Sequence, residues 1–153
     1  MFYFGYCTLL DVAEMARFCP GATPAGVAQL TGYQLCFSRY QSDPTRGSCD
    51  IVARPAHRMW GLLYEMIPAE YDELDRLAGV DKGHLARIDI LVTLADGRRL
   101  AATTYQNPGP AGPFTPTPAY CEPILRGAQA IELPATYIAE LNEIIAAHGV
   151  SQS

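Results

Sequence analysis

Short runs of hydrophobic residues, separated by polar and glycine-containing segments, mark the predicted elements of this chain. The first run, about residues 2 to 7, predicts a buried strand. A helix is predicted to begin near Asp11, where Asp11 and Glu14 have the spacing of a capping box. It should stop before Cys19, because a proline and a glycine follow directly. The chain therefore begins with a strand that runs into a helix N-terminus.

Alternating apolar and polar positions predict six further strands. The clearest hairpin signal is Asp96-Gly97, which lies between two such runs. Thr31-Gly32 and Pro55-Ala56-His57 are expected to form turns that separate neighbouring strands. The six predicted strands are Val27 to Leu30, Tyr33 to Tyr40, Cys49 to Ala53, Met59 to Met66, Arg87 to Leu94 and Arg99 to Tyr105.

Helical periodicity recurs in three later segments. Ala69 to Ala78 places apolar residues on one face and precedes Gly79, a typical residue after a helix C-terminus. Ala119 to Gln129 and Ala135 to His148 are the other two predicted helices. Asn107 to Pro118 is rich in proline and glycine and is expected to be a stiff surface loop. We expect one α+β domain over residues 1–153, with a sheet that curls into a barrel.

Composition and charge narrow the classes of partner. The 153 residues carry a net charge of −5, and arginines and lysines are scattered, so no basic surface for nucleic acid is expected. The apolar opening lacks a basic leader and is shorter than the roughly 18 residues of a membrane span. These features favour a cytoplasmic protein that binds neither nucleic acid nor membrane.

The five cysteines form no C-x-x-C pair, and the three histidines are far apart in the sequence. We therefore expect no metal site, no cofactor and no disulfide framework. Free and mostly buried thiols fit a reducing compartment.

The turn after the first strand is the best candidate for a binding site. Its backbone N–H groups precede a helix and should lack partners, so Thr8, Leu9 and Leu10 are expected to contact an anion or a carbonyl oxygen. Tyr6 ends the strand below them. Cys7 has two interpretations, either a nucleophile whose pKa is lowered by the helix or a small buried residue.

Seven motifs occur in the order found in the gamma-glutamylcyclotransferase-like (AIG2-like) family, which this chain resembles over nearly its whole length. The first, Tyr6-Cys7-Thr8-Leu9, corresponds to the Tyr-Gly-Ser-Asn-Leu or Tyr-Gly-Thr-Leu of the family's first turn. The others are Cys19-Pro20-Gly21-Ala22, Trp60-Gly61-Leu62-Leu63-Tyr64, Leu74-Asp75-Arg76-Leu77-Ala78-Gly79-Val80, Tyr105 after the hairpin, Pro116-Thr117-Pro118-Ala119-Tyr120, and Gly127-Ala128 before Leu133-Pro134.

The resemblance implies a small mixed β-barrel with surrounding helices and a pocket at the first turn, lined by Tyr105 and Tyr120 among others. In the family, a Glu takes a proton from the α-amino group of a gamma-glutamyl substrate, which cyclises to 5-oxoproline and releases an amine. The matching position here is Ala78. Asp75 and Asp81, three residues to either side, are the candidate replacements.

Three functions remain open at this point. The first is a cyclotransferase acting on a small gamma-glutamyl amide or a related carboxylated amide. The second is a lyase or decarboxylase, as implied by a resemblance to the C-terminal domain of allophanate hydrolase. The third is a ligand-binding or protein-interacting module without catalysis. The sequence does not predict an oligomeric state.

Overall fold

Five strands close into a barrel in the order β1-β3-β2-β4-β5. The computed structural model describes residues 1–39, 47–109 and 114–149. β1 pairs antiparallel with β3 and parallel with β5, so the first strand of the chain closes the barrel. The expected α+β barrel is thereby confirmed. The strands are β1 (Phe2–Gly5), β2 (Thr23–Arg39), β3 (Gly47–Glu65), β4 (Ala86–Leu94) and β5 (Arg99–Gln106).

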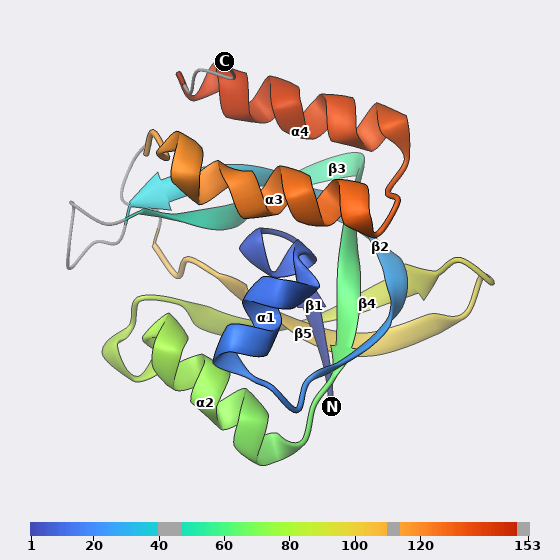
Figure 1. Ribbon diagram of the computed structural model, residues 1–153, viewed down its shortest axis with the longest axis vertical. Helices are drawn as coiled ribbons and strands as arrows, with labels where there is room; N and C mark the ends of the chain where they lie inside the picture. The colour runs from blue at the N-terminus through green and yellow to red at the C-terminus, as the bar shows by residue number, and fades with distance from the viewer. Residues whose placement is uncertain (40–46, 110–113, 150–153) are drawn as a thin grey trace.

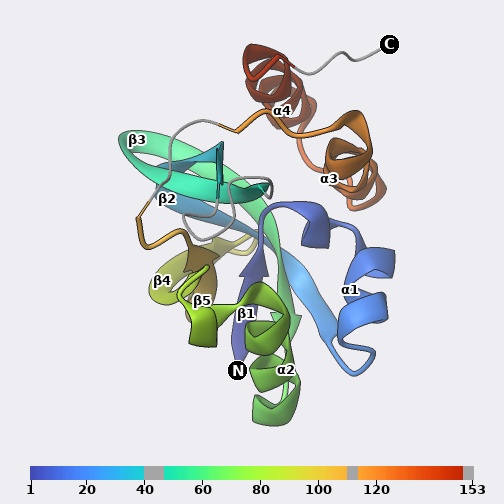
Figure 2. The same ribbon diagram turned by 90° about the vertical axis from the view of Figure 1, so that its left-hand side faces the viewer.

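Four α-helices surround this barrel. α3 and α4 lie side by side at one end, α2 lies at the other end, and α1 lies between them (Figures 1 and 2). A short 3₁₀ helix, η1 (Thr8–Leu10), follows β1, and a second, η2 (Val80–Lys82), follows α2. The α-helices are α1 (Val12–Phe18), α2 (Pro68–Ala78), α3 (Pro118–Ala130) and α4 (Ala135–Ala147).

β2 and β3 are each one long strand where the sequence predicted two, and this part of the prediction is wrong. The register shifts between Thr31 and Tyr33, which pair with Arg58 and Ala53. Residues 54–57 therefore face only Gly32, whose φ of +92° suits glycine. The turn residues thus form a bulge, which bends the paired strands around the barrel without ending them.

The helix ends follow the sequence signals, with one exception. The Asp11 carboxylate accepts a hydrogen bond of 3.0 Å from the Ala13 N–H, as expected of an N-cap. Glu14 does not complete the capping box, because its carboxylate pairs with Arg17 at 3.0 Å. α2 ends at Gly79, which has the left-handed φ of +74°.

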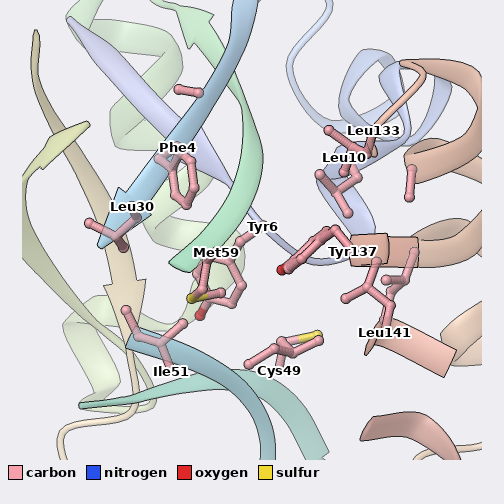
Figure 3. Close-up of a cluster of buried hydrophobic side chains, with 14 of the residues drawn as sticks. Phe4, Tyr6, Leu10, Leu30, Cys49, Ile51, Met59, Leu133, Tyr137 and Leu141 are labelled. Atoms are coloured by element: carbon pink, nitrogen blue, oxygen red, sulfur yellow. The ribbon is translucent and has the colours of Figure 1, made fainter. Parts of the chain in front are cut away.

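The core fills the barrel and continues under the two C-terminal helices. Figure 3 shows Phe4, Leu30 and Met59 on the strand side, facing Leu133 and Leu141 on the helix side. All five side chains are buried. This one apolar layer fixes α3 and α4 against the end of the barrel from which the first turn emerges.

α3 packs directly on that turn. Gly127 lies so close to the backbone of Leu10 and Asp11 that a methyl group at position 127 would overlap both. The Arg126 guanidinium forms an ion pair of 2.6 Å with Asp11. The Gly-Ala pair noted in the sequence therefore allows α3 to hold the turn.

The loop from Asn107 to Pro118 is described only in part, since residues 110–113 lie outside the described residues. Its start is tied to β3, because the Asn107 N–H donates a hydrogen bond of 2.9 Å to the buried Asp50 carboxylate. Phe114 packs edge-on against Tyr120 with 6.5 Å between ring centroids. In the described part of the chain, no helix is both long and apolar enough to cross a membrane.

Candidate functional site

A cavity of about 340 Å³ opens beside the first turn, between α1 and α2 on one side and the starts of β3 and α3 on the other. It includes six of the seven residues expected to bind the substrate; Leu10 is absent because its side chain is buried in the core. The lining residues are Tyr3, Tyr6, Cys7, Thr8, Leu9, Phe18, Ser48, Cys49, Leu74, Leu77, Ala78, Leu85, Tyr105 and Tyr120.

The backbone of the turn offers two N–H groups. Leu10 and Asp11 use theirs within the turn, donating to the carbonyls of Cys7 and Thr8 at 3.0 and 3.2 Å. The N–H groups of Thr8 and Leu9 have no acceptor among the residues that the structure describes. The Leu9 carbonyl accepts a hydrogen bond of 2.7 Å from the Tyr64 hydroxyl, which fixes the turn to β3. Thr8 and Leu9 therefore remain the donors suited to an anion or a carbonyl oxygen.

Cys7 is joined to Cys49 in a disulfide, which corrects the expectation of free thiols. Their Cα atoms are 6.2 Å apart, within the usual range for such a bond. Cys19, Cys36 and Cys121 are the free cysteines. Burial is the main cause that raises the pKa of the Cys36 thiol to about 11, and burial raises the pKa of the Cys121 thiol to about 11 as well.

The disulfide changes the interpretation of Cys7. A cysteine in this bond has no thiolate, so it is no nucleophile in this state. Its φ of −121° is negative, so the turn does not use the left-handed conformation that favours glycine. The bridge ties the turn to β3 across the cavity wall. Two of the five cysteines are therefore no longer free thiols, which weakens the argument for a reducing compartment.

Tyrosine hydroxyls occupy the deep part of the cavity and are already partly engaged. The Tyr6 hydroxyl donates a hydrogen bond of 2.8 Å to the Tyr105 carbonyl. Burial raises the pKa of Tyr6 well above its usual value. The Tyr120 hydroxyl accepts a hydrogen bond of 2.8 Å from the Cys49 N–H, next to the disulfide. These two tyrosines therefore hold β5 and β3 in place as well as lining the cavity.

Asp75 reaches the cavity through Tyr105. The Tyr105 hydroxyl donates a hydrogen bond of 2.6 Å to the Asp75 carboxylate, and Arg87 pairs with the same carboxylate at 2.7 Å. The Arg87 guanidinium lies over the ring of Tyr71, 3.7 Å from its centroid. Burial, and then the bond to Asp75, raises the pKa of Tyr105 well above its usual range. Tyr105 is thus a neutral hydroxyl between the cavity and a carboxylate.

Position 78 and Asp81 differ in their relation to the cavity. Ala78 lines it, so the position that the sequence resemblance matched to the family's Glu faces the candidate site. Asp81 is exposed on η2 and is not among the lining residues. Asp75 lies one helical turn before Ala78, with its carboxylate directed at Tyr105 and Arg87.

Ser48 is a lining residue that the sequence reasoning missed. The residue is 7% exposed, and its Oγ has no hydrogen-bond partner within the described part of the chain. Buried hydroxyls are normally paired, so an orphaned one in a cavity wall indicates a place for a ligand atom. Ser48 lies outside every strand and helix that the sequence predicted, and no local signal there indicated its burial.

Comparisons with known proteins agree with this architecture. A model of the AIG2-like family matches residues 58–141, which is more than half of the chain. The gamma-glutamylcyclotransferase of Bos taurus is 27% identical over 146 residues, covering 93% of this chain and 77% of the bovine protein. The Homo sapiens protein of the same name is 26% identical with the same coverage.

A solved structure described as a gamma-glutamyl cyclotransferase superposes with a TM-score of 0.87 at 26% identity, over 93% of this chain and 86% of the other. A second, described as a yeast cyclotransferase specific to glutathione, has a TM-score of 0.63 at 13% identity, covering 97% and 96% of the two chains. The second likeness concerns the fold alone.

Proposed function

This chain belongs to the AIG2-like family, and on that premise we propose that it is a cyclotransferase that converts small gamma-glutamyl amides to 5-oxoproline and a free amine. The observation that carries the proposal is the hydrogen bond from Tyr105, in the cavity wall, to the Asp75 carboxylate. No Asp or Glu among the described residues lines the cavity, and this hydrogen bond connects the cavity to a carboxylate outside it.

Two protons leave the substrate's α-ammonium nitrogen in this reaction, and the departing amine takes up both. The Tyr105 oxygen accepts the first proton while its own proton passes to Asp75. The freed α-amino nitrogen then attacks the side-chain carbonyl carbon, and the carbon–nitrogen bond of the amide breaks. The proton returns by the same route to the departing nitrogen. The ring nitrogen then gives up its second proton through Tyr105 to the released amine, which leaves as an ammonium ion, so no water or further reactant is consumed. Such proton transfer contributes about 10² to 10⁴ in rate.

The turn and the geometry of α2 support the remaining roles. The N–H groups of Thr8 and Leu9 are free to bind the oxygen that becomes negative during attack, or the substrate carboxylate. Asp75 and Ala78 are three residues apart on one helix, so both face the same side. Asp75, one turn before Ala78 on α2, takes the role of the proton acceptor, and Tyr105 connects its carboxylate to the cavity.

The test measures 5-oxoproline released from a panel of gamma-glutamyl amides. We expect turnover by the unchanged protein and a loss of at least about 100-fold in kcat for Asp75→Asn and for Tyr105→Phe. Asp72→Asn is the matched control, because Asp72 also reaches Arg87, at 3.6 Å, but its side chain is 78% exposed. An inactive unchanged protein, or an Asp75→Asn variant with full activity, would overturn the proposal.

A further inference from the structure

The cavity has two walls of different chemistry. The wall formed by β3, α3 and the turn carries hydroxyl groups, including the orphaned Oγ of Ser48. The opposite wall, formed by α1, α2 and the segment after η2, carries no polar side-chain atom. Its members are Phe18, Leu74, Leu77, Ala78 and Leu85.

The apolar wall is left open to water at its outer edge. Phe18 ends α1 and is 39% exposed, and Leu77 on α2 is 41% exposed. Both line the cavity although they come from different helices. Large apolar side chains gathered at the mouth of a cavity gain free energy when an apolar group covers them.

No charged side chain lines this cavity in the described residues. A carboxylate that entered beside Phe18 and Leu77 would lose water without gaining a partner, which is costly. An alkyl group in the same place loses nothing of this kind. The volume of about 340 Å³ is near the lower end of the roughly 300 to 1,000 Å³ typical of ligand pockets, so the complete ligand is small.

Resting on the proposed cyclotransferase function, we propose that the amine released from the substrate carries an uncharged apolar substituent, which lies against Phe18 and Leu77. The glutamyl part then lies toward the turn, where Ser48 and the Thr8 and Leu9 N–H groups can meet its oxygens. Amides of short alkyl or aryl amines are the favoured class, and amides of amino acids, whose leaving group bears a carboxylate, are disfavoured.

The test uses two glutaric acid monoamides of similar length, the n-butylamide and the glycine amide. Neither has an α-amino nitrogen, so neither can cyclise, and calorimetry measures binding alone. We expect the butylamide to bind at least about tenfold more tightly, since each buried methylene contributes to affinity and the glycine carboxylate does not. Equal binding, tighter binding of the glycine amide, or binding of neither overturns the inference.

Variants assign the preference to this wall. Leu77→Lys should reduce the preference to about threefold or less, because its ammonium group favours the carboxylate. Leu91→Lys is the matched control, since Leu91 is also exposed, at 47%, but lies on β4 outside the cavity. An equal effect of both variants overturns the inference. Turnover of the corresponding gamma-glutamyl butylamide is assayed separately, so the cyclotransferase function can fail while the binding preference stands.

Discussion

Cys7 and Cys49 form a disulfide although 42 positions separate them in the sequence. The bond joins the turn after β1 to the start of β3, and both residues line the cavity. A crosslink over a loop of this length removes conformational entropy from the unfolded chain. We therefore expect a reductant to lower the free energy of unfolding by about 2 to 4 kcal/mol.

Denaturant unfolding with and without a phosphine reductant measures this loss. The double variant Cys7→Ser/Cys49→Ser should unfold at the lower stability in both conditions. Thiol titration of the unfolded, unreduced protein is expected to find the three free cysteines, with all five appearing after reduction. Five thiols before reduction would contradict the bond.

Asp75 and Tyr105 are expected to act as one unit. If a single proton passes through both, then removing either group interrupts the route, and removing the second adds little. The double variant Asp75→Asn/Tyr105→Phe should therefore lose no more than about threefold in kcat beyond the slower single variant. Independent, multiplied losses in a double-mutant cycle would show that the two side chains contribute separately.

Ala78→Glu is expected to place a carboxylate directly in the cavity, since Ala78 is a lining residue. In the Asp75→Asn background this change should recover at least about tenfold in kcat, because the new carboxylate accepts the proton without Tyr105. Ala78→Gln has nearly the same shape and no basic oxygen of comparable strength, so it is the control. Equal recovery with Gln would rule out proton transfer as the cause.

Gly127→Ala is expected to destabilise the protein by roughly 1 to 3 kcal/mol, because the added methyl group overlaps the backbone of Leu10 and Asp11. Denaturant unfolding measures the change. Gln129→Ala, on an exposed position of the same helix, should stay within about 0.5 kcal/mol of the unchanged protein. A neutral Gly127→Ala would mean that α3 can move away from the turn without cost.

Stability is expected to fall above about pH 10. Burial is the largest cause that raises the pKa of Tyr71, to about 12, and burial also raises the pKa of Tyr3, Tyr6 and Tyr105. The folded chain keeps these protons where the unfolded chain, with ordinary values near 10, releases them. The unfolded state then binds fewer protons, so stability is full below about pH 10 and is lost as the pH rises toward 12.

Each such tyrosine removes up to about 1.4 kcal/mol per pH unit in that window. Unfolding by denaturant from pH 8 to 11 measures the loss, and the ultraviolet absorbance of phenolate follows the ionisation itself. If the buried tyrosines ionise near pH 10 in the folded protein, the predicted loss does not occur.

The sequence predicted the parts of the fold that depend on neighbouring residues. The Asp11 cap, the end of α2 at Gly79 and the hairpin at Asp96-Gly97 are all local signals, and all three are confirmed. The interruption at Gly32 was misread, because a bulge and a turn use the same residues. Only the pairing of Thr31 and Tyr33 with β3 distinguishes them.

The site was less predictable because its contacts join distant segments. The family resemblance drew attention to Asp75 and Tyr105, but their hydrogen bond spans 30 residues. The Cys7–Cys49 bond and the burial of Ser48 likewise depend on how β3 passes the first turn. No local spacing in the chain encodes such relationships. Substrate contact by Tyr6, Thr8, Leu9 and Tyr120 stays a prediction.

The parallel pairing of β1 with β5 also constrains the order of assembly. The Phe4 carbonyl accepts a hydrogen bond from the Thr104 hydroxyl, 100 positions later in the chain. During synthesis β1 is made before β5, and residues 6–98 come between the two strands. The first turn must therefore wait, unpaired on this side, until the hairpin of β4 and β5 has been made. Contacts of such long range slow the folding of a domain. The turn after β1 is thus translated well before β5 and is among the last segments to acquire its native surroundings.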